Sequence, residues 1–220
     1  MSALSQRLVF ALCLLFVCGP ATLTGCAQPR QAPLPVGNLK MGVAYFSQPA
    51  EPAEMLAGYL LENTPRIDQK ILAEMDILLA DVLAEESKNS FTSRESALSC
   101  GKKIASQRGR TNNEAALRTW SAIGRCMAVD LLAIPFLLEY RERIGSAVGV
   151  AEPAKVVMDI FVLDVRAESL ISRSRFDETQ SALSGNLLEA GKFLKRGGKW
   201  ITAHELAKEG MEKAIKELGL

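Results

Sequence analysis

The sequence has 220 residues, with 26 basic and 25 acidic side chains, and 48% of the residues are hydrophobic. A formal net charge of +1 gives no electrostatic reason to bind nucleic acid, because surfaces that bind nucleic acid carry a marked basic excess. The length is sufficient for one domain with a substantial hydrophobic core, and we expect a single domain over residues 39–220.

The first 25 residues have the layout of a secretory signal peptide. One basic residue, Arg7, precedes an apolar run over Leu8–Val17. Because this run is shorter than the ~20 residues that a transmembrane helix needs, we expect residues 1–25 to be cleaved. Residues 23–26 read Leu-Thr-Gly-Cys, which resembles the lipobox of bacterial lipoproteins. That resemblance implies that Cys26 is lipidated and becomes the first residue of the mature chain.

The residues around Cys26 also imply a location. A diacylglycerol and a further acyl chain on one residue give stable attachment to a membrane. Ala27 stands where an Asp retains such lipoproteins in the inner membrane of enteric bacteria, so the resemblance implies the periplasmic face of the outer membrane. The alternative is a plain secreted protein with an unmodified Cys26. Residues 26–38, rich in Pro and Gln, are predicted to form a short extended tether.

Hydrophobic periodicity predicts the first elements of the domain. Leu39–Ser47 is apolar in both alternate sets of residues, which predicts a central strand covered on both faces. Thr64 and Pro65 are the predicted N-cap and first turn of an amphipathic helix that ends near Ser87. The acidic residues of this helix are expected to face water: Asp68, Asp76, Asp81 and Glu85.

The middle of the domain is predicted to contain another helical region between two strands. A short strand near Phe91 leads to helical residues over Arg94–Gly124, interrupted near Gly109. Val129–Arg143 is predicted to be a strand that begins buried and runs out into solvent. Since Pro135 has no backbone N–H, this strand needs a bulge or an unpaired side there.

The pattern of the last third of the sequence predicts a hairpin and a C-terminal helix. Ala154–Val165 and Leu170–Glu178 are separated by four residues, which favours an antiparallel pair. Residues Thr202–Glu205 form a capping-box pattern ahead of an amphipathic C-terminal helix. The element order therefore predicts an α/β fold with a mixed sheet of about five strands and helices packed on it.

Location separates the five cysteines. Cys13 and Cys18 leave with the signal and Cys26 takes the lipid, so Cys100 and Cys126 remain. In an oxidising periplasm we expect these two to form a disulfide. The alternatives are two buried thiols or a metal site, but one His and two Cys lack the spacing of a tetrahedral site. We expect no metal and no cofactor.

Two features are candidate contacts for a partner. The basic residues Lys102, Lys103, Arg108 and Arg110 form a cluster that could meet lipid headgroups, anionic glycan or an acidic protein surface. The alternative is one solvated helix face. Trp200, just before the capping box, is either a hydrophobic staple onto the helix or an exposed aromatic anchor for a partner.

The sequence contains no recognisable catalytic motif. G-x-S-x-G, H-E-x-x-H, C-x-x-C and a phosphate-binding loop are all absent. The single histidine, His204, falls in the first turn of the last predicted helix with no neighbour in sequence to orient it. Asp159 interrupts an apolar strand and is expected to pair with Arg173 or Arg175. We therefore expect a protein that is not an enzyme.

The closing W-[IL]-T-A-x-E-L-A-x-E-G pattern at Trp200–Gly210, with the lipobox and the element order, carries a family resemblance. Together they resemble a group of periplasmic lipoproteins: the penicillin-binding-protein activators, the curli-secretion channel lipoprotein and the N-terminal domain of the Tol translocation protein. The chain also resembles a lipoprotein subfamily of sulfate-reducing and related bacteria, which implies no activity. The resemblance implies a binding or assembly role in the envelope and no catalytic residue.

Three functional hypotheses follow. The first is a non-enzymatic, outer-membrane-anchored domain that binds another envelope protein. The second is a carrier of a small ligand or lipid, with an apolar pocket between sheet and helices. The third is a hydrolase that uses Asp159 or His204.

Overall fold

The computed structural model describes residues 39–108, 116–180 and 194–220, so the predicted signal peptide and tether lie outside the described residues. The described part has an α/β fold, as predicted, with a five-stranded mixed sheet in the order β2-β1-β3-β6-β7. β1 is parallel to β2 and β3, whereas the β3–β6 and β6–β7 pairs are antiparallel. The strands are β1 (Met41–Val43), β2 (Phe91–Thr92), β3 (Leu131–Arg141), β6 (Lys155–Asp164) and β7 (Ser169–Thr179).

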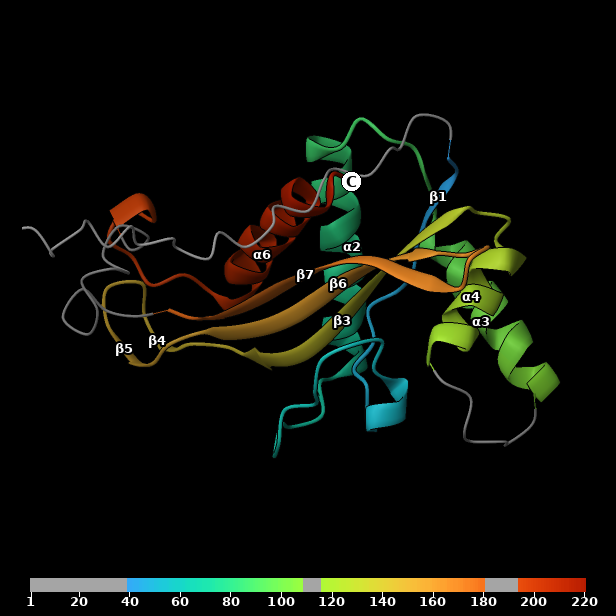
Figure 1. Cartoon of the computed structure of the whole chain (residues 1–220). Coiled ribbons are helices and arrows are strands. Elements are labelled where there is room, and N and C mark those ends of the chain that lie inside the picture. The colour runs from blue at the N-terminus through green and yellow to red at the C-terminus, as the bar shows by residue number, and fades with distance from the viewer. Residues whose placement is uncertain (1–38, 109–115, 181–193) are drawn as a thin grey trace, which may run out of the picture. The chain divides into compact units, whose positions relative to one another are not determined.

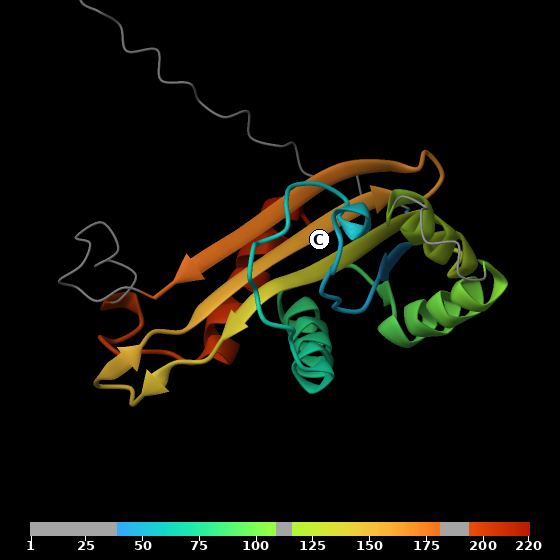
Figure 2. The same cartoon turned by 90° about the horizontal axis from the view of Figure 1, so that it is seen from below.

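Helices cover both faces of this sheet. The described α-helices are α2 (Gln69–Glu86), α3 (Arg94–Arg108), α4 (Ala116–Cys126) and α6 (Ala203–Leu218). α2 and α6 contribute to one hydrophobic core, and α3, α4 and the segment over residues 48–66 contribute to the other. Figure 1 shows α6 along the strands and α3 and α4 at one end of them. In Figure 2 the 48–66 segment crosses the strands on the side opposite α6.

The alternation of side chains along β6 explains the two cores. Val156, Met158, Ile160 and Val162 pack toward α2 and α6, while Val157, Phe161 and Leu163 pack toward the opposite face. All seven side chains are fully buried. A strand that is apolar on both faces must be covered on both, and β6 occupies such a position between β3 and β7.

Pro135 lies within β3, beside an irregularity in the neighbouring strand. The β1–β3 ladder pairs Val43 with Ala133, and the next bridge pairs Ser47 with Phe136. The four residue steps from Val43 to Ser47 therefore lie opposite the three steps from Ala133 to Phe136, which places one extra residue beside the proline. This bulge confirms the expected interruption, because the missing N–H of Pro135 falls where regular pairing is broken. It also ends β1 at Val43, earlier than the predicted Ser47.

The start of α2 differs from the prediction. The N-cap is Asp68, whose side chain accepts a hydrogen bond from Lys70 N at 2.8 Å, and not Thr64. The physical reason is Gln48, whose side-chain amide donates to Pro65 O at 3.0 Å and accepts from Ile67 N at 2.9 Å. These contacts engage the backbone that the first predicted turn would have used. The helix ends with Ser87 as its C-cap, as predicted.

The C-terminal helix has the predicted capping box. The Thr202 side chain accepts from Glu205 N at 3.1 Å, and Thr202 N donates to the Glu205 carboxylate at 2.7 Å. The residue directly before the cap is Ile201, which packs on the core, so the staple position belongs to Ile201 and not to Trp200. Sequence analysis missed a small second sheet, β4 (Ile144–Gly145) and β5 (Val150–Glu152), which lies between β3 and β6 in the chain.

None of the helices in the described ranges has the length and apolar character needed to cross a bilayer.

Candidate binding groove

A groove of about 550 Å³ lies between α2 and the edge of the sheet formed by β1 and β2. It opens at the carboxyl ends of these two parallel strands, where α3 begins, which is the position at which open α/β sheets commonly bind ligands. Its volume falls within the range of small-molecule sites, about 300–1,000 Å³. Most of its lining surface is apolar and comes from these residues: Val43, Ala44, Ile77, Leu79, Ala80, Leu83, Ala84 and Phe91. The polar and charged lining residues are Asp76, Asp81, Ser87, Asn89, Thr92, Ser93, Arg94 and Glu95.

A buried carboxylate, Asp76, lines this groove. One carboxylate oxygen accepts a hydrogen bond from Phe46 N at 2.6 Å, and the other accepts from Arg94 Nη1 at 2.8 Å. The prediction that Asp76 faces water is therefore wrong, because only 8% of the residue is exposed. The β1 bulge accounts for the first contact, since Phe46 lies among the residues that leave the regular ladder between Val43 and Ser47.

The environment of Asp76 disfavours its charge. Burial raises the pKa of this carboxyl above its ordinary value, although the hydrogen bonds from Phe46 and Arg94 act in the opposite direction. Burial also raises the pKa of the neighbouring Tyr45 phenol, and the negative charge of Asp76 adds to that effect. The mainly apolar groove therefore contains the Asp76 carboxylate, which is stabilised by hydrogen bonds from one guanidinium group and one backbone amide.

The rim of the groove is acidic. Asp81 and Glu95 line it together with Asp76, whereas Arg94 is the one basic side chain that lines it within residues 39–108, 116–180 and 194–220. Arg94 is engaged on both sides, since its Nε donates to Glu95 at 2.9 Å. Ile77, 57% exposed, presents an apolar side chain at the same groove. The arrangement suits an apolar segment that also carries a positive charge.

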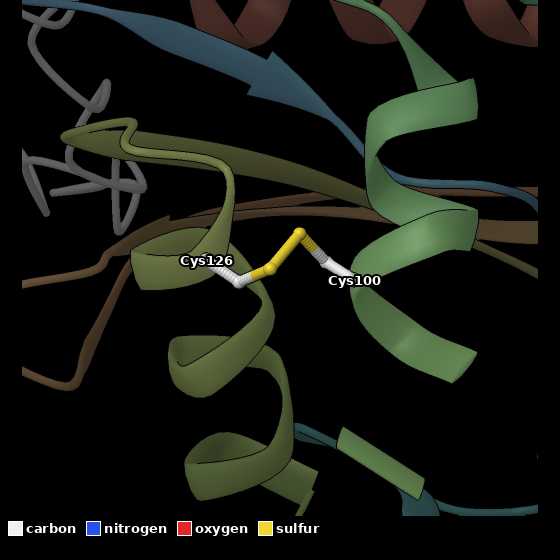
Figure 3. Close-up of a disulfide and its surroundings, with 2 residues drawn as sticks. All are labelled: Cys100 and Cys126. Atoms are coloured by element: carbon white, nitrogen blue, oxygen red, sulfur yellow. A yellow bond between two sulfur atoms is a disulfide. The ribbon is translucent and has the colours of Figure 1, made fainter. Parts of the chain in front are cut away.

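The disulfide fixes the helices next to this groove. Cys100 of α3 and Cys126 of α4 are joined, with their Cα atoms 5.8 Å apart (Figure 3). The structure therefore has the predicted bridge, and the alternatives of two free thiols or two metal ligands do not apply. Across the described residues no group of His, Cys, Asp and Glu is arranged to hold a metal ion. The bridge therefore joins α3, whose first residue Arg94 lines the groove, to α4.

Asp159 forms a second buried ionic cluster, on the opposite face of the sheet from α6. The residue is 0% exposed, and its carboxylate accepts from Arg173 Nε and Nη2 at 2.9 Å and from Arg175 Nη1 at 3.1 Å. Tyr59 lies over Arg175, with the guanidinium carbon 5.3 Å from the ring centroid. Both predicted arginines thus pair with Asp159. The cluster attaches the 48–66 segment to the sheet, a structural role.

The remaining predicted site residues lie apart from the groove lining. Lys102 and Lys103 are exposed on α3, while the side chain of Arg108 and all of Arg110 are outside the described part of the chain. His204 is exposed in the first turn of α6. Cys26 also precedes the first described residue, so its lipidation stays a prediction.

Trp200 is half-buried beside the β4–β5 hairpin. Its backbone N donates to Ala147 O at 2.9 Å, and its carbonyl accepts from Arg143 Nη1 at 2.8 Å. These bonds fix the backbone of Trp200 on the hairpin. Its role as a partner contact stays a prediction.

Sequence reasoning missed the Asp76–Arg94 pair, although one signal was present. Leu72, Asp76, Leu79 and Leu83 follow the four-three-four spacing of a single helix face. Asp76 therefore occupies a position of the buried stripe, and a carboxylate there needs a partner. The identity of that partner could not be read from the sequence, because it comes from a different helix, 18 residues away along the chain.

Comparison with known proteins yields structural likenesses alone. No protein-family model matches the chain, and no curated protein matches it. The PelC dodecamer from Paraburkholderia phytofirmans shares 11% identity, with 81% of this chain and 86% of that chain covered, at a TM-score of 0.44. The LpoB C-terminal domain from Salmonella enterica shares 10% identity, covering 64% and 83%, at a TM-score of 0.38. Lipoprotein GNA1162 from Neisseria meningitidis shares 14% identity, covering 73% and 99%, at a TM-score of 0.39. Likenesses at this level carry no information on function.

Proposed function

We propose that this chain is a lipid-anchored periplasmic protein that binds another envelope protein and acts as a non-enzymatic binding or assembly factor. The proposed anchor is Cys26, and the proposed docking site is the groove between α2 and the β1–β2 edge. The partner segment would be apolar and would carry at least one Lys or Arg. The outer membrane, facing the periplasm, is the proposed location.

The groove is the observation that carries the docking proposal. It combines an exposed apolar side chain, Ile77, with three carboxylates and one guanidinium, of which Asp76 and Glu95 pair with Arg94. A basic group on the partner would meet Asp81 and Glu95 at the rim, where it stays partly hydrated and contributes to the association rate and to specificity. The apolar part of the segment would contact Ile77 and the alanines of α2, which supplies the nonpolar burial that association requires.

The absence of a catalytic arrangement at this groove supports a binding role. Asp76 is occupied by Phe46 N and Arg94, and no histidine, cysteine or lysine of the described residues lines the groove. On the other face, the carboxylate of Asp159 accepts three guanidinium N–H groups. Both carboxylates are thus engaged by donors within the protein, which leaves them poorly placed to act as general bases.

Site-specific photo-crosslinking in cells tests the docking site. A photoreactive amino acid at position 77 of the full chain should yield an adduct with one envelope protein, and the same amino acid at Lys103 should not. Glu95→Lys should lower the yield from position 77, while Glu62→Lys, an exposed carboxylate of the 48–66 segment, should leave it unchanged. An adduct from Lys103 without one from position 77 would instead assign the contact to the basic cluster.

A second candidate function is supported by the size of the groove. A volume of about 550 Å³ with a mainly apolar lining would also hold a small amphiphile, which suits a ligand or lipid carrier. Native mass spectrometry of the full protein, extracted from its membrane, distinguishes the two. A bound small molecule that is lost in Ile77→Asp would favour the carrier, and an unliganded protein would favour the docking proposal.

A further inference from the structure

One end of the described domain combines exposed apolar side chains with basic residues, and we refer to it as the tip. It consists of residues 141–152, which contain the β4–β5 hairpin, and residues 194–200. Figure 1 places β4 and β5 at the end of the long strands opposite α3 and α4. The two segments are bonded to each other through Trp200 N and Ala147 O, at 2.9 Å. Arg196 attaches the second segment to the body of the domain through Glu178, at 2.7 Å.

Large apolar side chains of the tip point into solvent. Val148 at the hairpin turn is 89% exposed, Ile144 is 56% exposed and Leu194 is 65% exposed. Scattered apolar residues are ordinary on protein surfaces, but here three of the seven large hydrophobic residues that are exposed in the described part of the chain belong to one end. Trp200, half-buried on the hairpin, adds an aromatic ring to the same end.

The charge of the tip is basic. Residues 141–152 and 194–200 contain five basic and two acidic side chains. One base, Arg196, is paired with Glu178 and Glu209, and one acid, Glu142, accepts from Ala203 N at the start of α6. Lys195 and Lys199 are both exposed. An anionic surface would therefore meet a net positive charge next to the apolar side chains.

We propose that the tip binds the interface of an anionic phospholipid bilayer. Val148, Ile144 and Leu194 would enter the boundary between headgroups and acyl chains, and Trp200 would lie at headgroup level, where amphipathic rings are enriched. Lys195 and Lys199 would pair with lipid phosphates. A bilayer suits the tip better than a protein does, because a narrow hairpin turn bonded to a segment that carries two exposed lysines inserts into a fluid surface without a complementary pocket.

This proposal rests on the proposed anchor, which would keep the chain at a membrane. Residues 26 to 39 are thirteen steps apart in the sequence, so the connection can span at most about 45 Å. A tether of this length leaves the domain more than one orientation relative to the bilayer. Tip binding would select one of these orientations.

Fluorescence quenching by brominated phospholipid in vesicles of phosphatidylglycerol and phosphatidylcholine tests the proposal. The chain has two tryptophans, and Trp120 lies in the core, so the difference between the wild type and Trp200→Phe isolates the signal of Trp200. Trp200 emission should shift to shorter wavelength and lose most of its intensity. Ile144→Asp with Val148→Asp should restore the emission, whereas Ile171→Asp, an exposed position on β7 outside the tip and the groove, should not.

Other outcomes would overturn the proposal. Unquenched Trp200 in the wild type would mean that the tip stays in water, and a photoreactive group at position 148 that then captured a protein would assign the tip to a protein partner. Quenching that is unchanged in the double variant would place the contact elsewhere. Flotation of the Ile144→Asp, Val148→Asp double variant with the vesicles is measured in parallel and reports the anchor alone, so a failure of lipidation at Cys26 is distinguished from a failure of the tip.

Discussion

Replacing Asp76 with alanine removes the acceptor of two donors at once, and the structure gives the size of the effect. The N–H of Phe46, a residue that is 3% exposed, would be left without a partner, which costs about 1–3 kcal/mol. The side chain of Arg94 is 30% exposed and can be hydrated, so loss of its charge-assisted bond adds an amount near the lower end of about 1.5–3 kcal/mol. We expect Asp76→Ala to lower the free energy of unfolding by roughly 3 kcal/mol.

Asparagine at the same position separates the two contributions. Its side-chain oxygen can still accept from Phe46 N, so the expected loss is roughly 1 kcal/mol, mainly from the weaker contact with Arg94. Asp81→Ala on the same helix is the matched control, because Asp81 is exposed, and it should stay within about 0.5 kcal/mol of the wild type. Urea unfolding followed by circular dichroism measures all three variants. Equal midpoints for Asp76→Ala and Asp81→Ala would refute the structural role of the Asp76–Arg94 pair.

The pH dependence of stability gives an independent check on Asp76. Because burial raises the pKa of its carboxyl in the folded state, the protonated form is favoured by folding. The contribution of this group is fully present below its unfolded-state pKa and is lost as the pH rises through the higher folded-state value. The free energy of unfolding should therefore fall as the pH rises through this range in the wild type. Asp76→Asn, which does not titrate, should lack this fall. An identical decrease in both proteins would contradict the reasoning.

Further predictions concern the disulfide, a helix–sheet contact and a tyrosine. Reduction of the Cys100 bridge, which closes a separation of 26 residues, should lower stability by on the order of 3 kcal/mol in urea titrations with and without reductant. Gly210→Ala should cost about 1–3 kcal/mol because its Cβ would lie 2.7 Å from Phe176, whereas Gly149→Ala, with no atom within 4 Å, should be nearly neutral. Burial first, and nearby carboxylates second, raise the pKa of Tyr140 to about 12. Stability should therefore fall between the ordinary tyrosine pKa and about pH 12 in the wild type, and less steeply in Tyr140→Phe, as followed by alkaline denaturation.

Much of the fold could be predicted because its signals are local. The β6–β7 hairpin is set by two apolar runs and a short turn, and both strands lie within one or two residues of the predicted bounds. The capping box at Thr202 and the pair of cysteines left after processing likewise needed no tertiary information. Short-range spacing carries these features, so the sequence alone was enough to predict them.

The features that the sequence did not predict depend on contacts between distant segments. The start of α2 moved from Thr64 to Asp68 because Gln48, far earlier in the chain, occupies the backbone at Pro65 and Ile67. The partners of Asp76 in the groove are Phe46 N, from the irregular segment after β1, and Arg94 from another helix, and neither leaves a periodic signal. Propensity and periodicity describe a segment by itself, and tertiary contacts decide these cases.

The basic cluster shows a different limit of sequence reasoning. Lys102 and Lys103 are close in sequence and both exposed on α3, so the pattern described a real surface. A run of lysines cannot distinguish a solvated helix face from a docking site, because both need the same residues at the same spacing. Comparison of the crosslinking yield at Lys103 with that at position 77 distinguishes the two cases.

Labelling of cells with radioactive palmitate measures the proposed attachment of the folded domain to a membrane through Cys26. The wild-type chain should take up label and sediment with membranes, whereas Cys26→Ala should take up none and leave the membrane fraction. An unlabelled wild-type protein, together with a Cys26→Ala variant that stays equally membrane-bound, would contradict the proposed attachment.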